Sequence, residues 1–181
     1  MAEARGYTID RILALDPGPE ETAAVSIDLK FAEVNGGLLS FTSSDHVNLM
    51  GDFQPNAVRL QQLRAAERKE HALLIIEDMD SYGQPIGLST MTTLKMIGRL
   101  FEAWNAHAKF ITRREIKLHL CNTSRAKDAN VNAAVWDRFG GSRRAAVGTK
   151  KAPGPCYGFK TDIWAALAVG VTWIEQTLGQ R

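Results

Sequence analysis

The sequence predicts an α/β domain built on a five-stranded mixed sheet, with three antiparallel strands followed by two parallel ones and with helices flanking the sheet. Two observations support this fold class. Short apolar runs of strand length come first and are separated by turn sequences, which is typical of an antiparallel meander. Further apolar runs then alternate with segments of helical period, which is typical of parallel strands joined through helices.

The first half of the chain is predicted to contribute three strands and one helix. An apolar run over 12–16 stops at a Pro-Gly turn, so one strand ends there and a second is expected over 22–28. An Asn-Gly-Gly turn leads into a third strand over 38–42. Apolar side chains near helical spacing then predict a helix over 56–70.

The second half is predicted to alternate strands with helices. The continuous apolar run over 73–77 is typical of a buried central strand, and 109–112 is a second short strand. Between them, residues 88–107 repeat apolar side chains at i, i+3, i+4 and i+7, which predicts a long helix. Helices over 127–139 and 161–178 follow, the first of them closed by a glycine.

The composition is that of an ordinary globular chain. The 181 residues fit one domain, so residues 1–181 are expected to form a single unit. Apolar residues make up 45% and charged residues 23%, and no apolar run reaches the ~18 residues of a membrane span. The start of the chain has no apolar signal segment, and Cys121 and Cys156 lack the spacing of a zinc site. We therefore expect a cytoplasmic protein with reduced cysteines and no membrane partner.

Basic residues gather in one segment although the net charge is only +2. Residues 113–151 include ten basic and three acidic side chains, a local net charge of +7. Residues 141–160 are rich in glycine, proline and basic side chains and have no regular period, so a long, flexible basic loop is predicted there. Such a segment suits the phosphate backbone of a nucleic acid. The alternative is a solvated face that binds nothing.

Three carboxylates stand where the predicted fold would expose them together. Asp16 and Glu77 each end an apolar strand, on strands expected to be neighbours. Asp162 stands in the first turn of the last helix, where the helix dipole favours an ionised carboxylate. Such groups repel one another, and hard divalent cations, which prefer oxygen ligands, relieve that repulsion. The pattern therefore predicts the acidic site of a magnesium-dependent nuclease.

Several motifs resemble those of one nuclease family. The stretches ILALDPG (12–18), RREIK (113–117) and DIWAALAVG (162–170) are similar to motifs of RuvC-type Holliday junction resolvases, which have the ribonuclease H-like fold. The combinations that resemble the RuvC-like resolvases of phages and prophages are SYG-x-P-x-G, KLHLC, RAKDAN and KKAPGP-x-YG. The resemblance covers nearly the whole chain.

The resemblance implies a crossover junction endodeoxyribonuclease that cuts Holliday junctions or related branched DNA and leaves 5'-phosphates. It implies that Asp16, Glu77 and Asp162 hold two Mg²⁺ or Mn²⁺ ions, with Lys117 acting beside them on the scissile phosphate. Because a four-way junction has two-fold symmetry, the resemblance also implies a homodimer. It implies no nucleotide cofactor. The predicted helix over 88–107 either supplies the dimer interface or packs only on the sheet. A phage or prophage origin would place the protein in the bacterial cytoplasm.

DNA contacts are expected mainly from the basic segment. Lys117 and Lys127 resemble, by position, family lysines near the scissile region. Tyr82 is the aromatic side chain expected to touch DNA, with simple packing as its alternative. The full set of expected DNA-binding residues is Tyr82, Arg113, Arg114, Lys117, Lys127, Arg143, Arg144, Lys150 and Lys151.

Two positions depart from the family pattern. Bacterial RuvC proteins have a second carboxylate three residues after the first on the last helix, where this chain has Ala165. Asp78 or Asp80 could replace it, although strand alternation directs Asp78 to the opposite face from Glu77. The second family lysine falls either at Lys127 or one residue along, where this chain has Asp128.

Two other classes of function compete with a nuclease. A non-catalytic module that binds branched DNA on the same fold is conceivable because of Ala165, although Asp16, Glu77 and Asp162 argue against it. Actin-like phosphotransferases share an Asp-x-Gly turn after their first strand and bind nucleotide phosphates. They need two such domains, and this chain has one copy of the motif.

Overall fold

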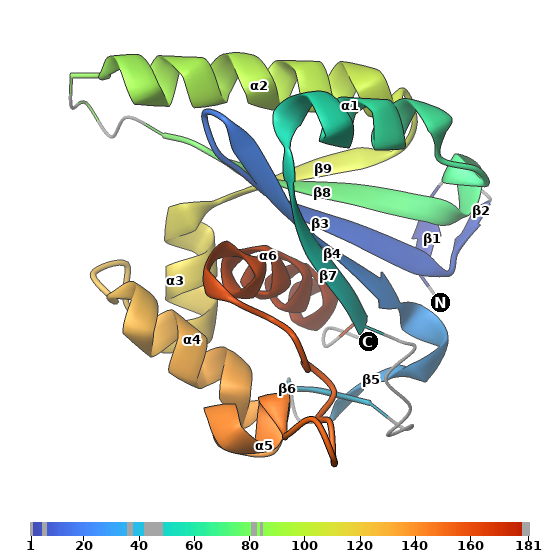
Figure 1. Cartoon of the computed structure of the whole chain (residues 1–181), viewed down its shortest axis with the longest axis vertical. Helices are drawn as coiled ribbons and strands as arrows, with labels where there is room; N and C mark the ends of the chain where they lie inside the picture. Colours follow the sequence, from blue (N-terminus) through green and yellow to red (C-terminus); the bar gives the residue numbers. More distant parts are fainter. Residues whose placement is uncertain are drawn as a thin grey trace.

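The chain is built on a five-stranded mixed sheet in the order β7-β4-β3-β8-β9 (Figure 1). The computed structural model describes residues 2–4, 7–35, 38–41, 49–80, 83 and 85–178. β4 runs antiparallel to β3 and β7, whereas β8 runs parallel to β3 and β9, which confirms the predicted fold class. The strands of this sheet are β3 (Arg11–Pro17), β4 (Glu21–Asp28), β7 (Leu49–Pro55), β8 (Ala72–Asp78) and β9 (Ala108–Thr112).

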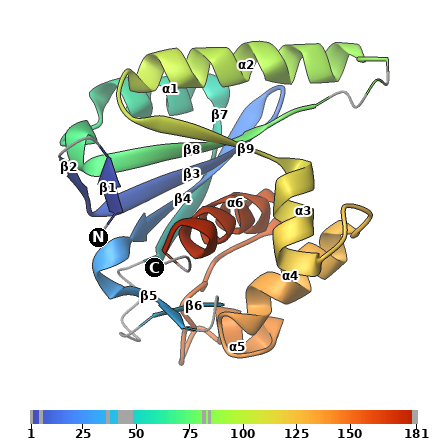
Figure 2. The ribbon, with the colours of Figure 1, turned by 180° about the vertical axis from the view of Figure 1, so that it is seen from behind.

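Helices cover both faces of the sheet, as the two opposite views show (Figures 1 and 2). Leu15 and Leu74 face a core covered by α1 and α2, while Ile75 and Leu167 belong to the core beneath α6. Successive residues of the buried strands thus serve different cores, which explains their continuous apolar sequences. The helices are α1 (Asn56–Ala65), α2 (Leu88–Trp104), α3 (Arg113–Cys121), α4 (Asp128–Asp137), α5 (Arg143–Val147) and α6 (Thr161–Leu178).

The third strand of the sheet is not the predicted one. Leu38–Phe41 does form a strand, β6, but it pairs with β5 (Ala32–Asn35) in a separate hairpin, and residue 42 lies outside the described residues. The third strand of the main sheet is β7, which lies at its edge next to β4. Only Leu49 of β7 is fully buried, so this edge strand lacks the apolar pattern that marks the others.

Several shorter elements were not predicted, and some helix ends differ. α1 ends at Ala65, five residues earlier than predicted, and α2 ends at Trp104. The predicted loop over 141–160 contains α5, while its flexibility stays a prediction. Besides β7, the described elements without a predicted counterpart are α3, α5, β1 (Ala2–Ala4), β2 (Tyr7–Ile9), β5 and the 3-10 helices η1 (Leu29–Phe31) and η3 (Lys69–His71).

α6 lies directly against the centre of the sheet because a glycine allows it to approach. A Cβ atom on Gly170 would lie 2.5 Å from Cδ1 of Ile27 and 3.3 Å from Cβ of Ala14. Most of the residues of α6 are buried. Among the described residues, no helix is both long and apolar enough to cross a membrane.

A buried carboxylate ties α3 and α4 to α6. Glu175 on α6 accepts hydrogen bonds from Nε and Nη2 of Arg138 at 2.9 Å each, and it lies 2.7 Å from Nε2 of His119 on α3. It also accepts a hydrogen bond of 2.7 Å from the backbone amide of Leu39. Burial alone would raise the pKa of Glu175, but these hydrogen bonds outweigh it and lower the pKa to about 2. Glu175 therefore holds the end of α4 and the last turn of α3 in fixed positions.

Candidate active site

Two of the predicted acidic residues lie side by side at the carboxyl ends of neighbouring parallel strands. Leu15 of β3 pairs in register with Ile76 of β8, so Asp16 and Glu77 occupy the next position along each strand. Side chains alternate along a strand, and Ile75 packs in the core beneath α6. Asp16 and Glu77 therefore both face the α6 side of the sheet.

Asp162 approaches from the N-terminus of α6. It is the second residue of that helix and is exposed. Asp16 and Asp162 line one cavity of about 380 Å³, together with Gly18, Glu21 and Phe53. All three predicted acids are thus brought to one end of the sheet, Asp16 and Glu77 by strand register and Asp162 by the start of α6.

Asp16 is harder to ionise than an ordinary aspartate. Burial and the neighbouring carboxylates Glu77, Asp162 and Asp128 together raise the pKa of Asp16 to about 7, although Arg113 acts in the opposite direction. Burial also raises the pKa of Glu77, again with Arg113 opposing it. Neighbouring carboxyl groups with raised pKa values are common at functional sites, and a bound cation would favour their ionised form.

Arg113, the first residue of α3, supplies the positive charge nearest to these acids. Its Nη1 lies 3.2 Å from Oε2 of Glu77, and its Nη2 lies 2.7 Å from Oδ1 of Asp128. Thr112 caps α3 through a reciprocal pair of hydrogen bonds with Glu115, which fixes the start of the helix. In the structure Arg113 lies between two carboxylates, and its contact with DNA stays a prediction.

Asp128 is a further acid at this site that the sequence did not assign. It is the first residue of α4, and its Oδ1 also lies 3.9 Å from Nζ of Lys117. A hydrogen bond from Arg113 lowers the pKa of Asp128 although partial burial opposes this. The available signal was its position, one residue after Lys127, where the resemblance allows a lysine.

The donor chemistry of these residues suits Mg²⁺ or Mn²⁺, which prefer carboxylate oxygens. The cavity beside Asp16 and Asp162 and the raised pKa of Asp16 agree with a place for positive charge. Within the described part of the chain, however, no three His, Cys, Asp or Glu side chains are close enough together to hold a metal ion. The cation that contacts Glu77 is Arg113.

The remaining residues predicted near the acids fall into different environments. Arg114 and Lys117 line a cavity of about 260 Å³ with Arg113, so α3 presents three basic side chains together.

The other predicted residues lie apart from this cavity. Asp78 lies on the same face of β8 as Ile76, which is the face opposite to Glu77. Its Oδ1 accepts a hydrogen bond from the backbone amide of Met79. Ala165 is partly buried on α6. Asp80 follows the end of β8 and is exposed, Lys127 is exposed just before α4, and Tyr82 lies outside the described residues.

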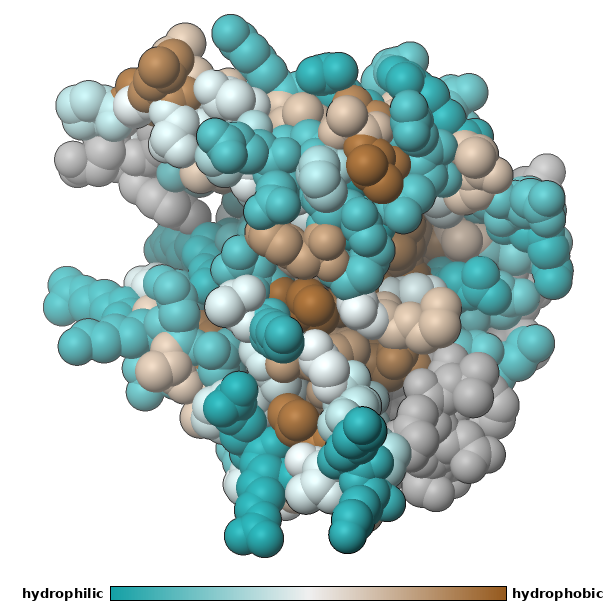
Figure 3. Space-filling model, viewed as in Figure 1, coloured by the Kyte–Doolittle hydropathy of each residue, from teal (hydrophilic) through white to brown (hydrophobic). Residues whose placement is uncertain are grey.

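The basic side chains of the predicted loop are separate from the acids. Arg143 and Arg144 start α5, and Lys150 and Lys151 follow it, all four exposed. α5 lies beyond α4, on the side away from the sheet (Figure 2). In the space-filling view, hydrophilic side chains project from the lower edge of the molecule, where α4 and α5 lie (Figure 3). The basic side chains of α5 and of the segment after it are therefore available at the surface.

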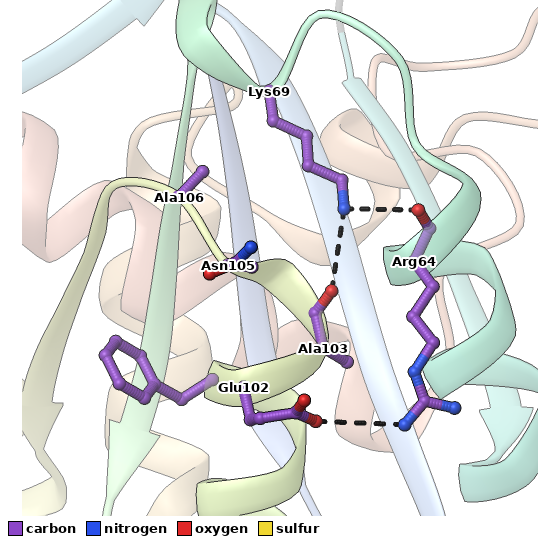
Figure 4. A pocket seen from close by; sticks show the side chains of 7 residues that line it. Arg64, Lys69, Glu102, Ala103, Asn105 and Ala106 are labelled. Atoms are coloured by element: carbon purple, nitrogen blue, oxygen red, sulfur yellow. Dashed lines mark hydrogen bonds and ion pairs between the residues drawn. The ribbon is translucent and has the colours of Figure 1, made fainter.

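A larger hollow, of about 700 Å³, lies at the other end of the parallel strands (Figure 4). Arg64 and Glu102 form an exposed ion pair of 3.8 Å across it, and Nζ of Lys69 donates a hydrogen bond of 3.2 Å to the carbonyl of Arg64. Lys69 precedes β8 and Ala106 precedes β9, whereas Asp16 and Glu77 lie at the ends of their strands. This hollow has one carboxylate, paired with an arginine, and is separate from the acidic site.

The fold agrees with solved structures of one protein. RuvC from Thermus thermophilus superposes with a TM-score of 0.54 at 17% identity, covering 91% of this chain and 93% of that one. The chain has the RuvC fold. T. thermophilus RuvC in complex with a Holliday junction substrate superposes with a TM-score of 0.56 at 16% identity, covering 94% and 96% of the two chains. No protein-family model matches the sequence, and no curated protein matches it.

Proposed function

We propose that this chain is a divalent-metal-dependent endonuclease that cuts Holliday junctions or related branched DNA and leaves 5'-phosphates. The observation that supports it best is the placement of Asp16 and Glu77 at neighbouring strand ends, with Asp162 reaching the same end from α6. The RuvC fold, which one solved neighbour displays in complex with a Holliday junction substrate, adds support from an independent direction. Phage or prophage origin is part of this proposal.

In this proposal Asp16, Glu77 and Asp162 hold Mg²⁺ or Mn²⁺. When bound, the ions supply Lewis acidity and a lowered pKa for the attacking water at the scissile phosphate. Lys117, one turn along α3 from Arg113, neutralises charge that develops on the phosphate. Arg114, exposed on the same helix, binds a neighbouring phosphate of the backbone.

The exposed basic side chains beyond α4 extend the DNA contact in this proposal. Arg143 and Arg144 on α5, with Lys150 and Lys151 after it, bind phosphates of a DNA arm. Such contacts position the duplex without reading its sequence, which suits a protein that recognises the shape of a junction. A homodimer would place one acidic site on each of two symmetric strands.

A non-catalytic module that binds branched DNA is the second candidate. Ala165 leaves the last helix with one acid in its first turns, and Arg113 contacts Glu77 where a metal ion is proposed. Both features are compatible with binding in the absence of cleavage. The two candidates differ in one property, metal-dependent hydrolysis.

Substitution of Asp16 by Asn tests the proposal, with junction binding and junction cleavage measured on the same samples. The wild type should bind a four-way junction and nick it with Mg²⁺ but not with chelator. Asp16→Asn and Glu77→Gln should bind comparably and lose at least 100-fold in cleavage. Asp137→Asn, an exposed acid at the end of α4, should cut like the wild type. Cleavage that survives in Asp16→Asn would refute the site, and wild-type binding without cleavage would favour the second candidate.

A further inference from the structure

The guanidinium of Arg113 bridges two carboxylates that belong to different elements. Nη1 contacts Oε2 of Glu77 on β8 at 3.2 Å, while Nη2 contacts Oδ1 of Asp128 on α4 at 2.7 Å. The side chain of Glu77 is 12% exposed, that of Arg113 is 29% exposed and that of Asp128 is 71% exposed. Arg113 therefore has one end in the acidic site and the other at the surface.

Lys117, on the same helix, contacts only the outer carboxylate of the bridge. Nζ of Lys117 lies 3.9 Å from Oδ1 of Asp128, at the outer end of the bridge. Within the described residues, the ion pair of Glu77 is made by Arg113. The positive charge of Arg113 therefore offsets the repulsion among Asp16, Glu77 and Asp128. In agreement with this, Glu77 and Asp128 contribute to the raised pKa of Asp16, whereas Arg113 lowers that pKa.

A divalent ion and Arg113 would compete for the same carboxylate. A metal ion held by Asp16 and Glu77 would need lone pairs of the Glu77 carboxylate, and Oε2 of that group already accepts a hydrogen bond from Arg113. The ion would also bring two positive charges close to the guanidinium, which disfavours both staying on one carboxylate. Metal binding is therefore expected to weaken the contact between Arg113 and Glu77.

Asp128 provides a place for Arg113 to go. It already makes the shorter of the two contacts with Arg113, and its exposed carboxylate stands at the N-terminus of α4, where the helix dipole favours negative charge. A guanidinium has five N–H donors, so Arg113 can transfer its inner donor to Asp128 or to a phosphate without becoming unpaired.

We propose that Arg113 is an internal counter-cation of the acidic site, which occupies Glu77 in the metal-free chain and is drawn onto Asp128 when a divalent ion binds. The proposal rests on the metal site of the proposed function. Arg113 contacts the carboxylate of Glu77, one of the three residues proposed to hold the metal. The proposal also predicts that this arginine opposes metal binding although its charge favours DNA.

Mn²⁺ binding to the DNA-free protein tests the proposal, with bound and free ion measured by electron paramagnetic resonance. Arg113→Gln should bind Mn²⁺ about tenfold more tightly than the wild type, because removing the competitor is expected to change affinity on the scale of one close ion pair. Arg113→Lys, which keeps the charge but not the two-ended geometry, should fall between them. Arg114→Gln removes an equal charge from the next position of α3 and should change affinity less than twofold.

The role of Asp128 is tested by a double-mutant cycle. Asp128→Asn alone should weaken Mn²⁺ binding about threefold, because Arg113 loses its outer anchor and stays on Glu77. In the Arg113→Gln background the same substitution should have almost no effect. Equal effects in both backgrounds would mean that Asp128 acts on the metal directly and would overturn this part of the inference.

The Mn²⁺ affinities of the wild type and Arg113→Gln distinguish a failure of the counter-cation role from a failure of the proposed metal site. Mn²⁺ binding that depends on Asp16 but is no tighter in Arg113→Gln would overturn the counter-cation role and leave the metal site intact. No Mn²⁺ binding by either the wild type or Arg113→Gln would overturn both. Circular dichroism spectra of every variant should match the wild type, so that a change in affinity is not a loss of fold.

Discussion

Arg138 and Glu175 form a buried, two-point ion pair, with Nε and Nη2 of the arginine each donating to the carboxylate at 2.9 Å. The side chain of Glu175 is 0% exposed and that of Arg138 is 8% exposed, so neither group has water as an alternative partner. This pair joins α4 to α6 and thereby fixes Asp128, at the other end of α4, relative to the sheet. The acidic site thus depends on a contact that lies outside it.

Glu175→Gln should destabilise the fold by about 3 kcal/mol, because it leaves the charge of Arg138 buried without a counter-charge. Urea denaturation at neutral pH measures the change. Glu102→Gln removes an acid from an exposed ion pair of 3.8 Å with Arg64 and should change stability by less than about 0.5 kcal/mol. Equal effects of the two substitutions would mean that the buried pair contributes no more than the surface pair.

Stability in chelator should fall as pH rises from about 4 to about 7. Asp16 has a pKa near 7 in the folded chain and 3.8 as its ordinary value, so the folded state binds more protons across this window. Asp16→Asn removes that ionisation and should be more stable than the wild type by about 2 kcal/mol at pH 8, but nearly equal to it at pH 4.

Asp137→Asn is the control for this pH dependence, since it removes an exposed acid from the end of α4. Its difference from the wild type should stay within about 0.5 kcal/mol from pH 4 to pH 8. If Asp16→Asn behaved in the same flat way, burial and neighbouring acids would not oppose the ionisation of Asp16.

Two glycines in helices should respond to alanine in opposite directions. A Cβ on Gly98 of α2 would meet nothing within 4 Å, so Gly98→Ala should stabilise the fold by about 0.5 to 1 kcal/mol through helix propensity. A Cβ on Gly170 of α6 would lie 2.5 Å from Ile27, so Gly170→Ala should destabilise it by about 1 to 2 kcal/mol. Thermal unfolding of both variants checks this, and stabilisation by Gly170→Ala would show that α6 can shift off the sheet freely.

Junction binding should depend on salt in proportion to the basic side chains that reach phosphates. Replacing Arg143 and Arg144 by glutamine should reduce the slope of log K against log salt concentration by about 2. Replacing Lys95 and Arg99, exposed on α2 across the sheet, should leave the slope unchanged. Filter binding at several salt concentrations measures both, and equal slopes for the two double variants would remove α5 from the DNA contact.

The parts of the fold that could be predicted are those whose sequence has one dominant pattern. β8 is apolar throughout because both of its faces are buried, and α2 shows a helical repeat because only one face packs on the sheet. β7 could not be predicted in the same way, because an edge strand with one fully buried residue has no such pattern. β6 has an apolar sequence and was predicted as the third strand, but its buried Leu39 donates its amide to Glu175 and does not join the sheet.

The site could be predicted where residues end regular elements. Strand register follows from the order of strands, so Asp16 and Glu77 were expected to be neighbours, and the structure places them so. The contact of Arg113 with Asp128 could not be predicted, because it depends on how α3 and α4 pack. α3 itself was not predicted because its sequence is short and strongly basic, although the capping-box spacing of Thr112 and Glu115 marks its start.

Cleavage of a synthetic four-way junction, compared with a fork, a flap, a linear duplex and single-stranded DNA of matched sequence, tests the central claim most directly. With Mg²⁺ the account predicts symmetric nicks with 5'-phosphate ends on the junction or on other branched substrates, little cutting of linear DNA, and none with chelator. Equal cutting of linear duplex, or cleavage that persists in chelator, would contradict it.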